Sequence, residues 1–117
     1  MITVYGIPNC DTVKRARAWL QERGTSVVFH DFKRQGVPVA RLDAWLRAIG
    51  HERLVNRQGT TWRKLDEALR HSVVDADSAR TLLLAHPSAI RRPVVEWADG
   101  ATSVGFDEAD WARRLSD

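Results

Sequence analysis

A short strand pattern passes directly into a helix pattern at the start of this chain, and a cysteine stands at the junction. Residues 2–5 (Ile-Thr-Val-Tyr) alternate and are β-prone, and the Gly-Ile-Pro-Asn that follows breaks the strand. A helical spacing begins at Asp11 and ends at Gly24, with three apolar residues on one face: Val13, Ala16 and Leu20. The sequence therefore predicts a strand–loop–helix unit with Cys10 at the helix N-terminus.

Cys10 is the only cysteine in the chain, so this protein cannot close an internal disulfide. At a helix N-terminus the unpaired N–H groups and the helix dipole favour the thiolate, which is the nucleophilic form of the side chain. A lone cysteine is, in general, more often a small buried residue without chemistry. The position of Cys10, and the Lys14, Arg15 and Arg17 that follow it, make a reactive thiol an equal alternative.

The composition predicts a single ordinary globular domain and excludes several classes of protein. A chain of 117 residues is long enough for one sizeable core, and it contains no apolar run that would span a membrane. A start without a signal-peptide pattern and a single cysteine indicate the reducing cytoplasm. The net charge of +3 comes with interspersed acidic residues, which does not indicate nucleic-acid binding. The four histidines lack metal-ligand spacing, and no phosphate-binding loop is present.

The middle of the chain has helical spacing after a second strand at residues 26–31. A helix starts near Pro38 and stops at Gly50, with apolar residues at i, i+3, i+4 and i+7: Leu42, Trp45, Leu46 and Ile49. A short helix or turn and a loop follow over residues 53–59. A third helix is expected through Trp62, Leu65 and Leu69. A fourth is expected from a cap at Asp75 or Asp77 to a stop before Pro87.

The end of the chain predicts a hairpin and a last helix. Residues 94–97 and 102–105 are strand-like, and Asp99-Gly100 between them is a strong hairpin signal. A final helix is expected to start at a cap on Asp107. The first β-α-β unit implies a parallel pair and the hairpin an antiparallel pair, so the sequence predicts a mixed four-stranded sheet flanked by helices. The five tryptophans are expected to be mostly core residues.

Three segments, residues 5–14, 54–62 and 86–95, resemble the arsenate reductase-like family of the thioredoxin fold. This family includes the Spx regulators and the YffB-type proteins, and the pattern is most similar to the YffB-type members. The resemblance implies an α/β thioredoxin-like fold forming one domain over residues 1–117. It also implies a helical insertion between strands two and three, at about residues 38–89.

The resemblance also implies a site. Cys10 matches the family's nucleophile, Arg57 and Arg92 match arginines that hold an oxyanion, and Pro93 matches the proline whose cis peptide bond faces the cysteine. Arg91 should point away from Arg92 along an extended segment, and we assign it no role. From their positions beside the sulfur, three further residues are candidate stabilisers of the thiolate: Asn9, Thr12 and Lys14.

The chain also departs from two patterns within the family. Arsenate reductases of this type carry a further arginine close to where this chain has Gly105-Phe106. Its absence removes one anion ligand and weakens the prediction of arsenate reduction. The two-cysteine spacing of the redox-sensing Spx regulators is missing as well, because Val13 stands where the second cysteine would be.

These observations predict a cytoplasmic, glutathione-dependent thiol reductase or thiol transferase that uses Cys10. Glutathione would be the co-substrate, and glutathione or glutaredoxin would supply the resolving thiol. We expect no metal, nucleotide or membrane partner. The alternative is a non-enzymatic adaptor, related to transcription, that docks on RNA polymerase as the Spx relatives do. Arsenate reduction is a third, less favoured activity.

Overall fold

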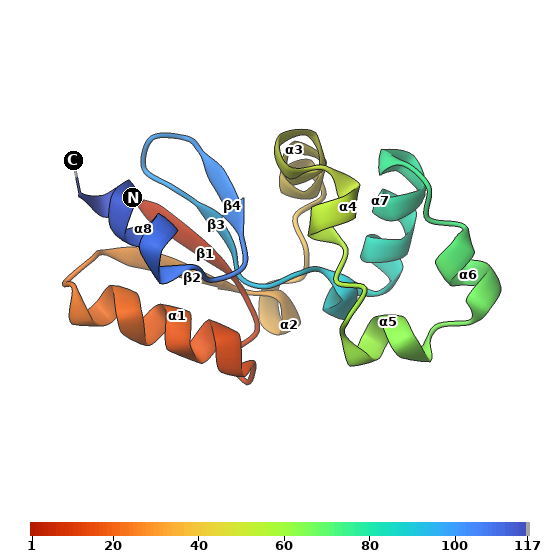
Figure 1. Ribbon diagram of the computed structural model, residues 1–117, viewed down its shortest axis with the longest axis horizontal. Helices are drawn as coiled ribbons and strands as arrows, with labels where there is room; N and C mark the ends of the chain where they lie inside the picture. Colours follow the sequence, from red (N-terminus) through yellow and green to blue (C-terminus); the bar gives the residue numbers. More distant parts are fainter. Residues whose placement is uncertain (117) are drawn as a thin grey trace. The chain divides into compact units, whose positions relative to one another are not determined.

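The computed structural model describes residues 1–116 and contains a four-stranded sheet and a series of helices (Figure 1). The elements in chain order are β1 (Ile2–Gly6), α1 (Asp11–Glu22), β2 (Val27–Asp31), α2 (Phe32–Gln35), α3 (Val39–Ile49), α4 (His51–Leu54), α5 (Thr60–Lys64), α6 (Glu67–His71), α7 (Ala76–Ala85), the 3-10 helix η1 (Pro87–Ala89), β3 (Val94–Glu96), β4 (Thr102–Val104) and α8 (Glu108–Leu115). The order of strand, helix, strand, helices, hairpin and helix is the predicted one.

The sheet is mixed, as predicted, with the strand order β2-β1-β3-β4. β1 pairs in parallel with β2, as a right-handed β-α-β crossover requires. β3 runs antiparallel to β1, with Tyr5 opposite Val94, and β4 pairs antiparallel with β3. The end of β1 and the start of β3 therefore lie at the same end of the sheet.

The chain divides into two compact units. The sheet unit consists of Met1–Asp31 and the described residues from Arg92 onward, and the helical unit consists of Phe32–Arg91. The sheet unit holds all four strands with α1 and α8, and the helical unit holds the helices from α2 to η1. The chain passes from β2 directly into the helical unit, because α2 starts at the residue after Asp31.

Tryptophan dominates the core of the sheet unit. Side chains of α1 and α8 pack with those of β1 and β3 in one cluster, whose buried members are Ile2, Val4, Ala16, Trp19, Leu20, Val95, Trp97 and Trp111. The indole of Trp97 donates a hydrogen bond of 2.8 Å to the Ser103 hydroxyl, which satisfies its polar atom inside the core. All five tryptophans of the chain are buried, which confirms their predicted core role.

The predicted hairpin and last helix are both present. Gly100 has φ +89°, a conformation that glycine adopts without steric cost, and its N–H donates to the Trp97 carbonyl. The Asp99 carboxylate accepts from the Ala101 N–H at 3.0 Å and so stabilises the turn. The Asp107 side chain accepts from the Asp110 N–H at 3.1 Å, which confirms the predicted cap of α8.

The single third helix expected through Trp62, Leu65 and Leu69 is wrong. The structure has two short helices there, and Leu65 between them is extended, with ψ 149°. The side chain of Asp66 accepts a hydrogen bond from the Ala68 N–H and starts a new helix. An N-cap inside the apolar spacing therefore overrides the periodicity.

The N-terminus of α7 gives a prediction on stability against pH. Asp75 is the cap, and hydrogen bonds from the Ser78 hydroxyl and backbone N–H hold the pKa of the Asp75 carboxyl below its ordinary value. Because the native pKa is lowered, this contribution is present above about pH 4 and is lost as the pH falls through the native pKa. We expect Asp75→Ala to have a lower melting temperature than the wild type at pH 7. This difference in melting temperature should become smaller as the pH falls towards about 2. Asp75→Asn is the matched control, because asparagine can cap the helix but carries no charge. The difference in melting temperature between Asp75→Asn and Asp75→Ala should not depend on pH over this range.

Candidate active site

Cys10 occupies the predicted place at the start of α1. It is the N-cap residue, with extended backbone angles (φ −97°, ψ 126°), and its carbonyl accepts the Lys14 N–H at 2.9 Å. The thiol is free and the residue is partly exposed. Its side chain does not cap the helix, so the sulfur is not held by the first-turn N–H groups. A partly exposed thiol beside the positive end of a 12-residue helix is suited to act as a nucleophile.

The loop that carries Cys10 starts from a close approach between β1 and α1. A methyl group added to Gly6 would lie 2.9 Å from Cγ2 of Val13, closer than real side-chain contacts allow. Val13 is fully buried and β-branched, so it has little freedom to move away. Gly6 therefore lets the first turn of α1 pack directly against the end of β1, where the loop of residues 7–10 begins.

This contact predicts that Gly6→Ala destabilises the protein by about 1–3 kcal/mol, because an extra methyl group must fit into a filled space. The free energy of unfolding in urea measures the effect. Val13→Ala removes the obstructing methyl groups, so the double variant should be less destabilised than the sum of the two single variants. Simple additivity would show that the two residues do not compete for space.

Arg92 and Pro93 lie just before β3, at the sheet end where β1 leads into the Cys10 loop. Their peptide bond is cis, as predicted. Pro93 is buried, and its carbonyl accepts the Gly105 N–H at 2.9 Å. Arg92 is partly exposed, with its Nε atom buried. The topology thus brings the Cys10 loop and the Arg92–Pro93 segment to one end of the sheet.

Gly105 and Phe106, at the position where the sequence lacks the further arginine, have a structural role in this chain. Gly105 has φ +82°, where glycine is favoured, and it is the residue hydrogen-bonded to Pro93. Phe106 packs against the core, with its ring centroid 4.7 Å from that of Trp111. Both residues therefore serve the fold at this position, and neither offers a cation to an anion.

The three candidate stabilisers of the thiolate all lie at the start of α1 or in the loop before it. Asn9 and Lys14 are exposed, whereas Thr12 is partly buried. Their roles stay predictions, since the exposed side chains have freedom to approach or to leave the sulfur.

Arg57 belongs to the helical unit and lies on the loop between α4 and α5. The residue is exposed, and its guanidinium carbon lies 4.7 Å from the centroid of the Trp62 ring. Arg91 is also in the helical unit, where its Nε donates to the Arg53 carbonyl at 2.9 Å. Arg91 thus has a structural contact of its own within the helical unit. A site shared by Arg57, Arg92 and Cys10 stays a prediction.

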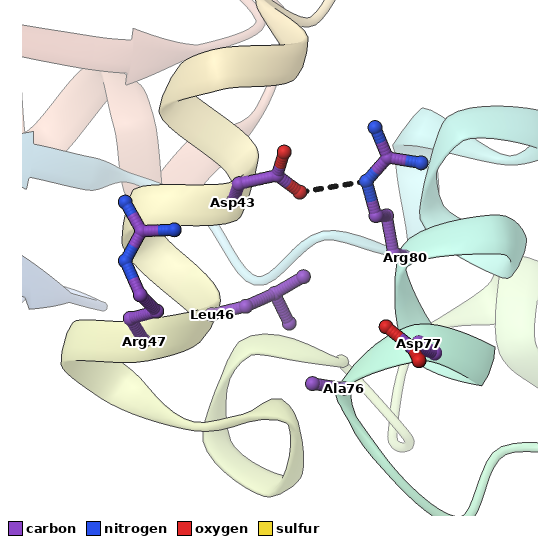
Figure 2. A pocket seen from close by; sticks show the side chains of 6 residues that line it. All are labelled: Asp43, Leu46, Arg47, Ala76, Asp77 and Arg80. Carbon is purple, nitrogen blue, oxygen red and sulfur yellow. Dashed lines mark hydrogen bonds and ion pairs between the residues drawn. The ribbon is translucent and has the colours of Figure 1, made fainter.

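A separate pocket of about 440 Å³ lies between α3 and α7 (Figure 2). Its lining residues are Asp43, Leu46, Arg47, Ala76, Asp77 and Arg80. Arg80 Nε donates to Asp43 Oδ1 at 2.6 Å and so joins the two helices across the pocket (Figure 2). None of the predicted site residues lines this pocket. The charges of Asp43 and Arg80 within it already neutralise each other in part.

The described residues offer neither a metal cluster nor a membrane-spanning helix. Over residues 1–116, no group of three or more His, Cys, Asp or Glu side chains is placed to hold a metal ion. In the same part of the chain, no helix has both the length and the apolar character needed to cross a bilayer.

Comparison with known proteins identifies the family. The sequence profile of the ArsC family matches residues 5–114, which is nearly the whole chain. The chain belongs to the ArsC family. Its mixed sheet with flanking helices is accordingly the thioredoxin-like fold of this family, as the resemblance implied. Membership in the ArsC family supports a thiol reductase-like function in broad terms.

Two solved structures are similar to this chain over almost its full length. A YffB protein is 43% identical, with a TM-score of 0.93, and the match covers 99% of this chain and 100% of that one. An arsenate reductase (ArsC) related protein from Brucella melitensis is 47% identical, with a TM-score of 0.75, covering 99% of this chain and 95% of that one. The similarity to the YffB protein agrees with the predicted YffB-type pattern.

Two curated relatives are similar over most of the chain. An uncharacterized protein of Haemophilus influenzae is 40% identical over 95% of this chain and 96% of its own. The global transcriptional regulator Spx of Bacillus subtilis is 26% identical over 98% of this chain and 87% of its own. The relatives therefore include a regulator, and similarity alone does not show whether this chain is an enzyme or a regulator.

Proposed function

We propose that this ArsC-family protein is a cytosolic, glutathione-dependent thiol reductase in which Cys10 is the nucleophile. The observation that carries the proposal is the placement of a partly exposed free thiol at the N-cap of α1. The same end of the sheet carries Arg92 and Pro93. A thiol at a helix N-terminus, at a sheet end that also carries an arginine, is a chemical arrangement suited to attack on sulfur.

The proposed reaction is a pair of thiol–disulfide exchanges. In the first, the Cys10 thiolate attacks the glutathione sulfur of a glutathionylated substrate, forms a mixed disulfide with glutathione and releases the substrate thiolate. In the second, the thiolate of a second glutathione attacks the glutathione sulfur of that mixed disulfide. Oxidised glutathione leaves, and the Cys10 thiolate is regenerated. In the net reaction one glutathione thiol is consumed, the substrate sulfur returns to the thiol state, and the disulfide bond passes from the substrate to oxidised glutathione.

The arginines would hold glutathione by its two carboxylates. A guanidinium binds a carboxylate through two parallel N–H···O bonds, which gives both energy and orientation. Arg92 would act from the sheet end beside the cysteine, and Arg57 would act from the helical unit. Asn9, Thr12 and Lys14 would assist the thiolate through hydrogen bonds or charge. Glutaredoxin is the alternative source of the resolving thiol.

This assignment predicts that Arg92→Ala and Arg57→Ala each weaken glutathione binding. The expected loss is about 1.5–3 kcal/mol, the usual value of a hydrogen bond to a charged group. A steady-state assay with a glutathionylated peptide and reduced glutathione would measure it as a raised KM for glutathione. Matched controls are Arg113→Ala in the sheet unit and Arg63→Ala in the helical unit, both exposed arginines that should leave KM unchanged. Equal effects in the arginine variants and their controls would contradict a specific role.

The second candidate function is a non-enzymatic adaptor that docks on RNA polymerase. It is favoured by the similarity to the Spx regulator over nearly the whole chain. Under this alternative the wild-type protein would show no Cys10-dependent turnover in the same assay. Arsenate reduction is less favoured, because Gly105 and Phe106 leave no cation where arsenate reductases of this type carry an arginine.

A further inference from the structure

Arg57 and Trp62 form a cation–π pair within the helical unit. The guanidinium carbon lies 4.7 Å from the centroid of the indole ring, within the range of a cation–π contact. The two partners differ in exposure, since the Arg57 side chain is exposed and Trp62 is only 8% exposed. A long, exposed arginine side chain therefore lies on the ring of a buried tryptophan.

The loop that carries Arg57 is fixed at both ends. At its start, Val55 forms an antiparallel bridge with Ile90, and the Asn56 N–H donates to the Ala89 carbonyl at 2.8 Å. The Asn56 side chain then accepts the Gln58 N–H at 3.2 Å, so the backbone turns tightly around Arg57.

The far end of the loop is held by packing. A methyl group added to Gly59 would lie 2.7 Å from Nδ2 of Asn56, so this amide fills the space beside the glycine. Trp62 follows in the first turns of α5, which begins at Thr60. The backbone of Arg57 and the ring of Trp62 are therefore tied together by local structure.

The contact with the ring leaves the N–H edge of the guanidinium available for hydrogen bonds. The guanidinium carbon lies over the Trp62 ring. When a guanidinium stacks on a ring through one flat face, its N–H groups point outward in its own plane. Within residues 1–116, no carboxylate forms an ion pair with Arg57. A planar carboxylate or oxyanion from outside the chain would fit this edge through two parallel hydrogen bonds.

We propose that Trp62 is the positioning residue of the anion site: its ring holds the Arg57 guanidinium flat and presents its N–H edge to a carboxylate of the incoming thiol. This inference rests on the proposed function for the identity of the ligand. It goes further by naming what orients Arg57 and by specifying a planar, two-oxygen anion as the group bound. It also implies that charge alone is insufficient at position 57, because a lysine neither stacks as a plane nor donates in a fork.

The test is a double-mutant cycle on the full chain, with reduced glutathione as the probe and its Kd measured by NMR titration. Trp62→Leu should weaken binding about threefold to tenfold, in keeping with the strength of cation–π contacts. In an Arg57→Ala background the same change should have almost no further effect. Trp62→Phe keeps an aromatic ring and should bind within about threefold of wild type. Arg57→Lys should bind as weakly as Arg57→Ala.

A spectroscopic signal tests the stacking independently of glutathione and of turnover. The Arg57 side-chain protons should be shifted upfield by the indole ring in the wild type and should lose this shift in Trp62→Leu. Additive effects of the Trp62 and Arg57 changes on Kd, or unshifted Arg57 protons in the wild type, would overturn the inference. If either result is found while Cys10-dependent turnover persists, the positioning role of Trp62 is rejected and the proposed enzyme activity stands. If the Trp62 and Arg57 changes have non-additive effects on Kd but the protein shows no Cys10-dependent turnover, the proposed enzyme activity is rejected instead.

Discussion

Cys10→Ser is expected to abolish turnover of a glutathionylated peptide, a loss of at least about three orders of magnitude. The proposed reaction passes through a mixed disulfide on Cys10, and a serine hydroxyl neither ionises near neutral pH nor forms a disulfide. No other cysteine in the chain can take over the role. The release of oxidised glutathione from reduced glutathione and the peptide measures the effect.

The control for this variant is its stability. Cys10 is partly exposed and its side chain caps nothing, so Cys10→Ser should unfold in urea within about 0.5 kcal/mol of wild type. A folded Cys10→Ser protein that keeps wild-type turnover would remove Cys10 from the mechanism. Turnover absent from both proteins would favour the adaptor alternative.

Trp111→Ala is expected to have the largest effect on stability, about 3–5 kcal/mol. Trp111 is only 1% exposed. Its ring centroid lies 4.7 Å from that of Phe106, 5.1 Å from that of Trp97 and 5.9 Å from that of Trp19, and all three pairs are edge-to-face. Truncation would leave a large cavity between α8 and the sheet and would remove three aromatic contacts. Unfolding in urea, followed by far-UV circular dichroism, measures the loss.

Trp111→Phe separates the loss of aromatic contacts from the loss of volume. It keeps a ring in the cluster and should cost clearly less than the alanine variant. Val74→Ala is a surface control, because Val74 is 70% exposed and should change stability by less than about 0.5 kcal/mol. If Trp111→Ala were as mild as Val74→Ala, the tryptophan cluster would not be the main support of the sheet unit.

The sequence was sufficient for the features whose signals are local. Asp99-Gly100 predicted the β3–β4 hairpin because a glycine with positive φ is needed at that turn. Asp107 predicted the start of α8 because its carboxylate can accept a first-turn N–H. The apolar spacing of α1 and α3 predicted their buried faces, since it follows the period of the helix.

Features that depend on competition or on close packing were not predictable in this way. The apolar spacing at Trp62, Leu65 and Leu69 indicated one helix, but the Asp66 side chain stabilises a new helix start instead. The need for glycine at residue 6 arises from Val13, which the fold brings to within 2.9 Å of an added methyl group. Neither a propensity nor a period carries that information.

The residues of the candidate site also differ in whether the sequence carries a signal for them. Cys10 followed from the strand–helix junction, and Arg92 and Pro93 from the resemblance together with the antiparallel direction of β3. Trp62 was predicted only as a core residue, because sequence spacing does not show that the Arg57 guanidinium lies on its ring. The aromatic residue five positions after an arginine, across a loop with Asn and Gly, is the signal that was available for it.

The central claim, a nucleophilic Cys10 that accepts glutathione, is tested most directly by intact-protein mass spectrometry after incubation with oxidised glutathione. Because Cys10 is the only thiol, any glutathionyl group gained through a disulfide is assigned to it. We expect the folded protein to gain one such group and to lose it again on addition of reduced glutathione. A folded protein that stays unmodified, while the urea-unfolded chain takes up the group, would contradict the claim.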